Sequence, residues 1–244
     1  MWYPSHFIVI PLSYLVILLL AAYTRRLSKK SRLRLLRILF MAVICSECLK
    51  QAYGLRNGCY STAYLPFHYS TTYYVSLGLC AFGNERQRHY AQCSLLVGGV
   101  LLLITMTCSP FSVVGDCAFI FTEWPALHSL LYHCVTLFAL AMMLACGAYH
   151  PQRYDSLRSL SFLYTWATIA VPAAYVTQTN YAGLLESYLP FLEKLRLAYG
   201  NLAYLVAYML LVSALAVLIL QIHAWILRRA TAQKHAGTEK EPMA

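Results

Sequence analysis

Seven long apolar stretches follow one another along the chain, and short polar segments separate them. About 20 apolar residues suffice to cross a bilayer as a helix. Lipid cannot satisfy the backbone polar groups of an irregular or open structure, and the strict apolar–polar alternation of barrel strands is absent, so the pattern predicts helices. The stretches are residues 7–23, 35–53, 63–82, 93–108, 124–149, 160–178 and 199–227.

This pattern predicts an all-α fold, a polytopic membrane helix bundle of about seven transmembrane helices within residues 1–229. The second and third spans are weaker than the others, because Glu47, Lys50 and His68 interrupt them. Residues 230–244 are polar, and we expect them to form a disordered cytoplasmic tail.

The basic residues lie mostly on one side of this arrangement. Of the 19 Lys and Arg residues, 15 follow the first, third, fifth and seventh spans. Because cytoplasmic segments are enriched in Lys and Arg, we expect an outside N-terminus, a cytoplasmic C-terminus and a multi-pass protein of the plasma membrane. The exceptions are Lys50, Arg56, Lys194 and Arg196.

The composition excludes several classes of protein as first interpretations. The 244 residues are 60% apolar and 11% charged, and the mean hydropathy is +0.56. A soluble domain has about 25% charged residues, so a soluble enzyme, a disordered chain and a nucleic-acid-binding domain are disfavoured. The net charge of +10 then indicates topology and contact with lipid headgroups rather than with nucleic acid.

Polar residues gather in the outer half of the predicted membrane, whereas the inner halves of the same spans are largely apolar. Ionisable side chains at such depths are costly and usually line a cavity. His133 is the deeper of two histidines in its span, at roughly 15 Å. We therefore expect a polar cavity lined by Glu47, Lys50, His68, Ser70, Thr71, Thr72, His128, His133, Asn180 and Tyr181.

Simpler roles for these residues stay open. Glu47 and Lys50 are three positions apart on one helical face and can pair with each other. His68 can hydrogen-bond a backbone carbonyl in a helix that a nearby proline loosens. His128 and His133 lie about 140° apart around a helix, so one of them is expected to be structural.

The sequence predicts neither a metal site nor a cofactor. The two histidines have the spacing H-x-x-x-x-H, which lacks the H-E-x-x-H arrangement of two ligands and a base. Cys59 and Cys117 fall in two predicted outer loops, where a disulfide can form in an oxidising exterior, although nothing in the sequence fixes the distance between them.

Short blocks of the chain resemble a known family. The segment Leu65-Pro66-Phe67-His68-Tyr69-Ser70 resembles the Leu-Pro-Leu-His-Leu-Cys signature of YwaF-like bacterial integral membrane proteins. Four other blocks resemble that family in matching order, so the resemblance covers most of spans two to seven. They are Glu47-x-x-Lys50, residues 124–133, Asn180-Tyr181 and residues 195–204. The resemblance implies six to seven membrane helices. The family's eukaryotic relatives include a transmembrane acyltransferase that remodels ether phospholipids with a Cys and a His.

One position departs from that signature, because Ser70 stands where the family has its Cys. A hydroxyl is a weaker nucleophile than a thiolate and needs a positioned base. In an acyl-transfer hypothesis, His133 is the general base and Ser70 the nucleophile. Thr71 and Thr72 are alternative nucleophiles, three and four residues from His68 on its helical face.

The remaining residues have supporting roles in this hypothesis. His68 orients the acyl carbonyl, Asn180 donates a hydrogen bond to it, and Glu47 fixes a histidine tautomer. The partners would be membrane lipids, with a lysophospholipid and an acyl donor as substrates. The alternatives are a small-solute transporter or ligand-binding membrane component without catalysis, and a non-catalytic partner or sensor subunit.

Overall fold

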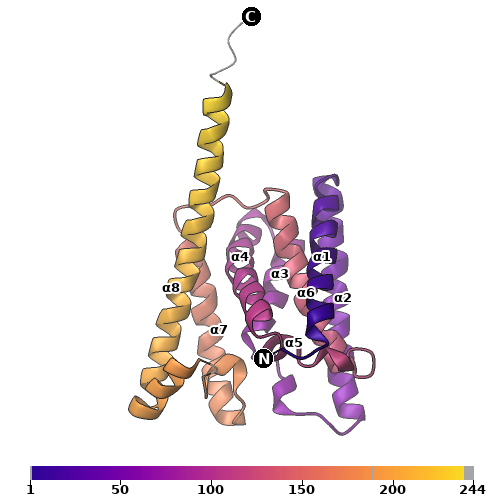
Figure 1. The fold of residues 1–244 in the computed structure, drawn as a ribbon, viewed down its shortest axis with the longest axis vertical. Coiled ribbons are helices and arrows are strands. Elements are labelled where there is room, and N and C mark those ends of the chain that lie inside the picture. Colours follow the sequence, from indigo (N-terminus) through magenta and orange to yellow (C-terminus); the bar gives the residue numbers. More distant parts are fainter. Residues whose placement is uncertain (1, 188, 239–244) are drawn as a thin grey trace, which may run out of the picture.

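The computed structural model describes residues 2–187 and 189–238. These residues form helices joined by short connections, and none of them forms a strand. The long helices run up and down in turn, and short connections join them (Figure 1). In order they are α1 (His6–Thr24), α2 (Lys29–Arg56), η1 (Thr62–Tyr64), η2 (Tyr69–Thr71), α3 (Thr72–Phe82), α4 (Glu85–Cys108), α5 (Phe111–Val114), η3 (Cys117–Phe119), α6 (Trp124–Ala145), α7 (Asp155–Thr177), η4 (Tyr181–Gly183) and α8 (Pro190–Thr238).

Helices coincide with six of the seven apolar stretches and with the second half of the other, residues 63–82. Among the described residues, five helices are long and apolar enough to cross a membrane: α1, α4, α6, α7 and α8. α2 has 28 residues but carries Glu47 and Lys50 among its apolar residues. α3 has 11 residues and is therefore only about 16 Å long. The all-helical membrane fold is confirmed, while a count of seven spans and the orientation of the termini stay predictions.

The predicted span at residues 63–82 is helical only in its second half, so this prediction was wrong for its first half. Pro66 lacks a backbone N–H and disfavours helical geometry at the residue before it, and Leu65 is extended, with φ −64° and ψ 146°. His68 is extended too, with φ −62° and ψ 145°. His68 therefore does not share a helical face with Thr71 and Thr72.

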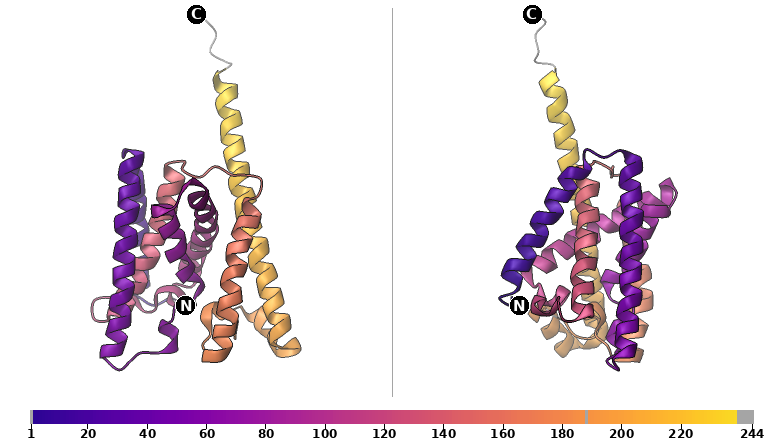
Figure 2. Two further views of the ribbon diagram at one scale, coloured as in Figure 1. Left: turned by 180° about the vertical axis from the view of Figure 1, so that it is seen from behind. Right: turned by 90° about the vertical axis from the view of Figure 1, so that its right-hand side faces the viewer.

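α4 packs against α3, α6, α7 and α8, while α1 and α2 both pack against α6 (Figure 2). The approach of α3 to α4 is close, because Gly98 presents no side chain: a Cβ there would lie 2.5 Å from Cε1 of Tyr73. The Tyr73 hydroxyl donates to the Gly98 carbonyl at 2.7 Å.

The alternating helices place their connections at two ends of the bundle (Figures 1 and 2). The end that holds the N-terminus, here called the N-terminal end, also holds the α2–α3, α4–α6 and α7–α8 connections. The opposite end, here called the C-terminal end, holds the α1–α2, α3–α4 and α6–α7 connections.

α8 is interrupted at Gly200, where φ is +86°, a value that glycine adopts without strain. The helix then continues past residue 229 to Thr238, into the segment that the sequence assigns to a tail. The rest of that segment, residues 239–244, lies outside the described residues.

Candidate functional site

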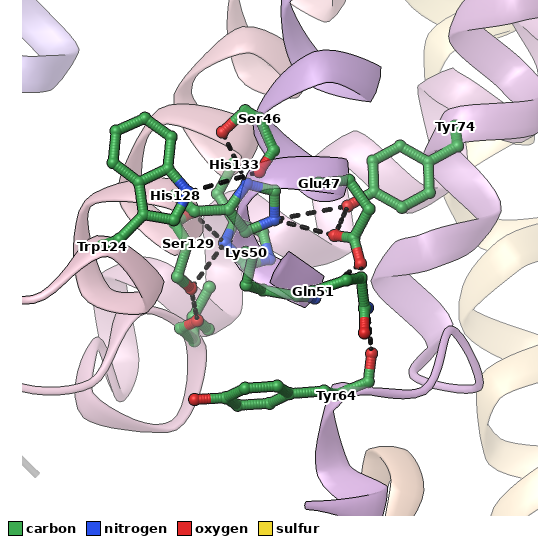
Figure 3. A network of polar contacts seen from close by, with 11 residues as sticks. Ser46, Glu47, Lys50, Gln51, Tyr64, Tyr74, Trp124, His128, Ser129 and His133 are labelled. Carbon is green, nitrogen blue, oxygen red and sulfur yellow. Dashed lines mark hydrogen bonds and ion pairs between the residues drawn. The ribbon is translucent and has the colours of Figure 1, made fainter. Parts of the chain in front are cut away.

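His128 on α6 lies at the centre of a polar network (Figure 3). It lies near the start of α6, which begins at the N-terminal end (Figure 1). Its side chain is buried. Its Nε2 lies 3.0 Å from Oε2 of Glu47, and its Nδ1 lies 2.8 Å from the Ser46 hydroxyl. Because an ionised carboxylate can only accept, Nε2 donates to Glu47 and Nδ1 is left to accept from Ser46. The bond to Glu47 therefore fixes the tautomer of His128, and the basic Nδ1 atom points at the Ser46 hydroxyl.

Glu47 joins this histidine to several other side chains. Its carboxylate accepts from Tyr74 at 2.7 Å and from Gln51 at 2.6 Å, and it forms the predicted ion pair with Lys50 at 2.8 Å. The side chains of Glu47 and Lys50 are 15% and 16% exposed. A charge in such a setting persists only when it is paired and hydrogen-bonded, so the network keeps Glu47 ionised beside His128.

His133 lies further along α6 and is buried too. Its Nδ1 lies 2.7 Å from the Ser129 carbonyl oxygen, which can only accept, so Nδ1 carries the proton and Nε2 keeps its lone pair. The rings of His128 and His133 both lie beside the ring of Tyr132, with 5.9 Å and 4.8 Å between the centroids. Both predicted histidines of α6 therefore belong to one site, and each has a defined tautomer.

Residues 65–71 reach this site as an irregular segment held by α7 and η4. Trp166 donates from Nε1 to the Phe67 carbonyl at 3.0 Å. Tyr181 is fully buried, and its ring packs edge-on against His68 with 5.2 Å between the ring centroids. Irregular backbone at membrane depth needs this kind of protein burial.

The hydroxyls of Ser70 and Thr71 in this segment, and of Thr72 at the start of α3, differ in their surroundings. Thr71 donates to the His68 carbonyl at 2.6 Å, and Thr72 donates to the Tyr69 carbonyl at 2.7 Å. These two hydroxyls therefore stabilise the local backbone. Ser70 lies beside the hydroxyl of Tyr132, and no hydrogen bond joins it to a histidine within the described part of the chain.

Asn180 is engaged within its own loop. Its Nδ2 donates to the Glu186 carbonyl at 3.0 Å, and its Oδ1 accepts from the backbone N–H of Leu185 at 2.9 Å. The amide shapes the connection between α7 and α8. Its predicted role as a donor to substrate would require these bonds to break.

Four side chains of the site were not predicted from the sequence: Ser46, Gln51, Tyr74 and Tyr132. Ser46 precedes Glu47 on a helix, and a serine in an apolar stretch gives no signal by itself. Tyrosine is abundant, with 20 residues, so composition does not single out the two that matter. Their common signal is position, because each lies within four residues of a predicted site residue.

All nine cysteines are free thiols, including Cys59 and Cys117. Cys59 is exposed, whereas Cys117 is buried. Burial raises the pKa of the Cys117 thiol to about 11, so this thiol stays protonated and unreactive near neutral pH. The disulfide that the sequence allows between the two is absent from the structure.

A second polar cluster lies at the C-terminal end. Ligand atoms of His89, Cys93 and Asp155 lie within 4.8 Å of one another, close enough to hold a metal ion. The Asp155 carboxylate, however, already accepts from His89 at 2.8 Å, from Arg158 at 2.7 Å and from Tyr149 at 2.6 Å. We interpret the cluster as a clamp between α4, α7 and the α6–α7 connection.

A cavity of about 790 Å³ adjoins that clamp, between residues 149–156 and residues 220–232 of α8. It lies at the opposite end of the bundle from His128. This cavity is therefore distinct from the polar site that the sequence predicts.

The comparisons with known proteins give one match. The family model described as the TMEM164 family matches residues 1–232. No curated protein and no solved structure matches the chain.

Proposed function

Because this chain belongs to the TMEM164 family, a family of transmembrane proteins, we propose that its polar site performs chemistry on membrane lipids, as an acyltransferase that remodels them. The observation that carries the proposal is the line from the Ser46 hydroxyl through His128 to Glu47. A hydroxyl, an imidazole and a carboxylate in this order are the parts of an activated serine nucleophile. The resemblance to YwaF-like proteins, with an acyltransferase among their relatives, supports the same chemistry.

The proposed reaction proceeds in two balanced steps. The Ser46 oxygen attacks the ester carbonyl carbon of a donor lipid, and Nδ1 of His128 takes the serine proton. The bond to the leaving lysolipid oxygen breaks, and His128 returns the proton to that oxygen, which leaves an acyl-serine. The hydroxyl of an acceptor lysophospholipid then attacks the acyl-serine, and the same proton transfers run again. Glu47 stabilises the imidazolium that forms in each step.

Ser70 with His133 is the second pair that could supply the nucleophile and base. Nε2 of His133 is free of the Ser129 carbonyl bond and can accept a proton, and Ser70 replaces the signature Cys. His68 lies two residues before Ser70 and is proposed to orient the acyl group. The proposed site therefore contains two candidate nucleophiles, Ser46 and Ser70, and substitution of each serine in turn can show which of them reacts.

The proposed substrates are phospholipids, because the site lies where a lipid could enter it from the bilayer. Lys50 and Glu47 lie in α2 toward the N-terminal end, which we propose faces the outer leaflet of the plasma membrane. A phospholipid can reach such a site from the bilayer with its headgroup near Lys50. Thr71, Thr72, Asn180 and Tyr181 are proposed to shape the lipid-binding surface through the backbone that they stabilise.

The test is acyl transfer by the purified full chain in phospholipid vesicles supplied with an isotope-labelled lysophospholipid. We expect labelled diacyl lipid from the wild type and at least a roughly 100-fold slower rate from His128→Ala, the scale on which a lost acid–base group acts. Ser46→Ala should cause a similar loss if Ser46 is the nucleophile, and Ser70→Ala if Ser70 is. His150→Ala is the control, since His150 is exposed near the opposite end.

Two results would contradict the proposal. A folded wild type that yields no diacyl product would favour a transporter or ligand-binding component. Full activity of both His128→Ala and His133→Ala would exclude histidine-dependent acyl transfer at this site.

A further inference from the structure

Tyr132 on α6 carries a buried hydroxyl without a hydrogen-bond partner in the described part of the protein. Its side chain is 4% exposed. Buried polar atoms are paired in the great majority of cases, because an unpaired one loses its hydration without compensation. An exception of this kind calls for a specific explanation.

The neighbouring tyrosines show that pairing is available in this region. Tyr73 donates to the Gly98 carbonyl at 2.7 Å, and Tyr74 donates to Glu47 at 2.7 Å. Their rings lie 6.3 Å and 4.7 Å from that of Tyr132, between centroids. Tyr73 and Tyr74 thus each donate to a fixed acceptor. The Tyr132 hydroxyl has the Ser70 side chain beside it but forms no hydrogen bond of ordinary geometry with any described residue.

The surroundings of Tyr132 place it in the site proposed for catalysis. Its ring is parallel to the His128 ring, at 5.9 Å between centroids and 5° between planes, and it lies 4.8 Å from the His133 ring. Ser70 lies beside its hydroxyl. The donor thus adjoins both histidines and one of the two serines.

We propose that the Tyr132 hydroxyl binds the carbonyl oxygen of an ester-linked acyl chain, which makes an ester lipid the ligand of this site. The role rests on the proposed function and deepens it by naming the ligand group and its donor. A fixed neutral donor strengthens its bond as negative charge develops on the carbonyl oxygen during attack. Tyr132 takes the part that the sequence assigns to Asn180, whose amide is held in its own loop.

The test compares Tyr132→Phe with Tyr73→Phe, because each removes one hydroxyl from a buried ring. Thermal unfolding of the purified full chain gives the first readout. Tyr132→Phe should unfold at or above the wild-type temperature, since its hydroxyl has no internal partner to lose. Tyr73→Phe should unfold at a lower temperature, because it loses the bond to Gly98.

The second readout is binding that needs no turnover. A diacyl phospholipid should raise the unfolding temperature of the wild type more than its dialkyl ether analogue, which has no carbonyl. Tyr132→Phe should respond equally to both lipids, whereas Tyr73→Phe should keep the preference for the ester. In the acyl-transfer assay, Tyr132→Phe should lower kcat by about 10²-fold or more, and its KM should rise by the factor by which ester binding is weakened.

The outcomes separate this inference from the proposed function. A wild type that prefers the ester lipid but transfers no acyl chain would leave the Tyr132 role standing and overturn the enzyme. An active wild type with an equally active and equally ester-selective Tyr132→Phe would overturn the Tyr132 role alone. Unfolding of Tyr132→Phe well below the wild-type temperature would also overturn it, because it would reveal an internal partner.

Discussion

At the residue scale, one carboxylate decides the state of the histidine. Glu47 binds His128 at 3.0 Å through Oε2 and Lys50 at 2.8 Å through Oε1. As a pure acceptor it forces the proton of His128 onto Nε2, and this leaves Nδ1 free to take the proton of Ser46. The tautomer is thus a consequence of the charge on Glu47.

Glu47→Gln tests this dependence. A glutamine amide can donate to Nε2, which would move the histidine proton to Nδ1 and remove the base from Ser46. We expect a loss of acyl-transfer rate of about 10²- to 10⁴-fold and a loss of about 1–3 kcal/mol in the free energy of unfolding. Rate and denaturation measurements on the same preparation would check both.

Glu193→Gln is the matched control for that substitution. Glu193 pairs with Arg196 three residues away, as Glu47 pairs with Lys50, but Glu193 lies on α8 outside the site. Equal losses of rate in both variants would show that removal of a carboxylate, and not the tautomer of His128, is the cause.

The sequence could predict some members of this site and not others. Glu47, Lys50, His68 and His128 are ionisable residues in apolar stretches, and their cost in lipid marks them. The partners of His128 depend on the rotation of α2 against α6, which local sequence does not specify. In the sequence, Tyr132 is indistinguishable from a membrane-interface tyrosine. Only the structure shows that its hydroxyl is buried without a hydrogen bond to a described residue.

At the scale of elements, a close contact between α3 and α4 supports the irregular segment with Ser70. Gly98 is the point of contact, and α3 begins directly after that segment. Proline alone did not predict where helices fail: Pro11 and Pro172 lie inside α1 and α7, because a long apolar run can tolerate one lost backbone bond. Pro66 ends helical structure in a more polar stretch.

Gly98→Ala tests the contact between these helices. The added methyl would lie 2.5 Å from Cε1 of Tyr73, so the Tyr73 ring or α3 must shift and the bond to the Gly98 carbonyl is strained. We expect a loss of about 1–3 kcal/mol in the free energy of unfolding, as for other overpacked cores. Val75→Ala on α3 is the control, since Val75 is 53% exposed. A Gly98→Ala protein as stable as the wild type would contradict the close contact.

At the scale of the whole molecule, most of the basic connecting segments and the His128 network lie at opposite ends of the bundle. The C-terminal end carries the basic connections, including Arg25 and Arg26 between α1 and α2 and Arg153 between α6 and α7. His128 lies near the start of α6, which begins at the N-terminal end (Figure 1). Since basic connections tend to stay in the cytoplasm, we expect the site to face the outer leaflet. The described helices alternate in direction, while the number of membrane spans and their orientation stay predictions.

The orientation can be tested with an epitope tag placed before residue 1 or after residue 244 in intact cells. We expect antibody to bind the N-terminal tag without permeabilisation and the C-terminal tag only after it, because inversion would place the connections rich in Arg and Lys outside. The opposite pattern would move the site to the cytoplasmic leaflet. The donor and acceptor lipids would then have to come from that leaflet, while the chemistry proposed for Ser46, His128 and Glu47 would be unchanged. Orientation and catalysis are therefore independent predictions, and a failure of one leaves the other to stand on its own measurements.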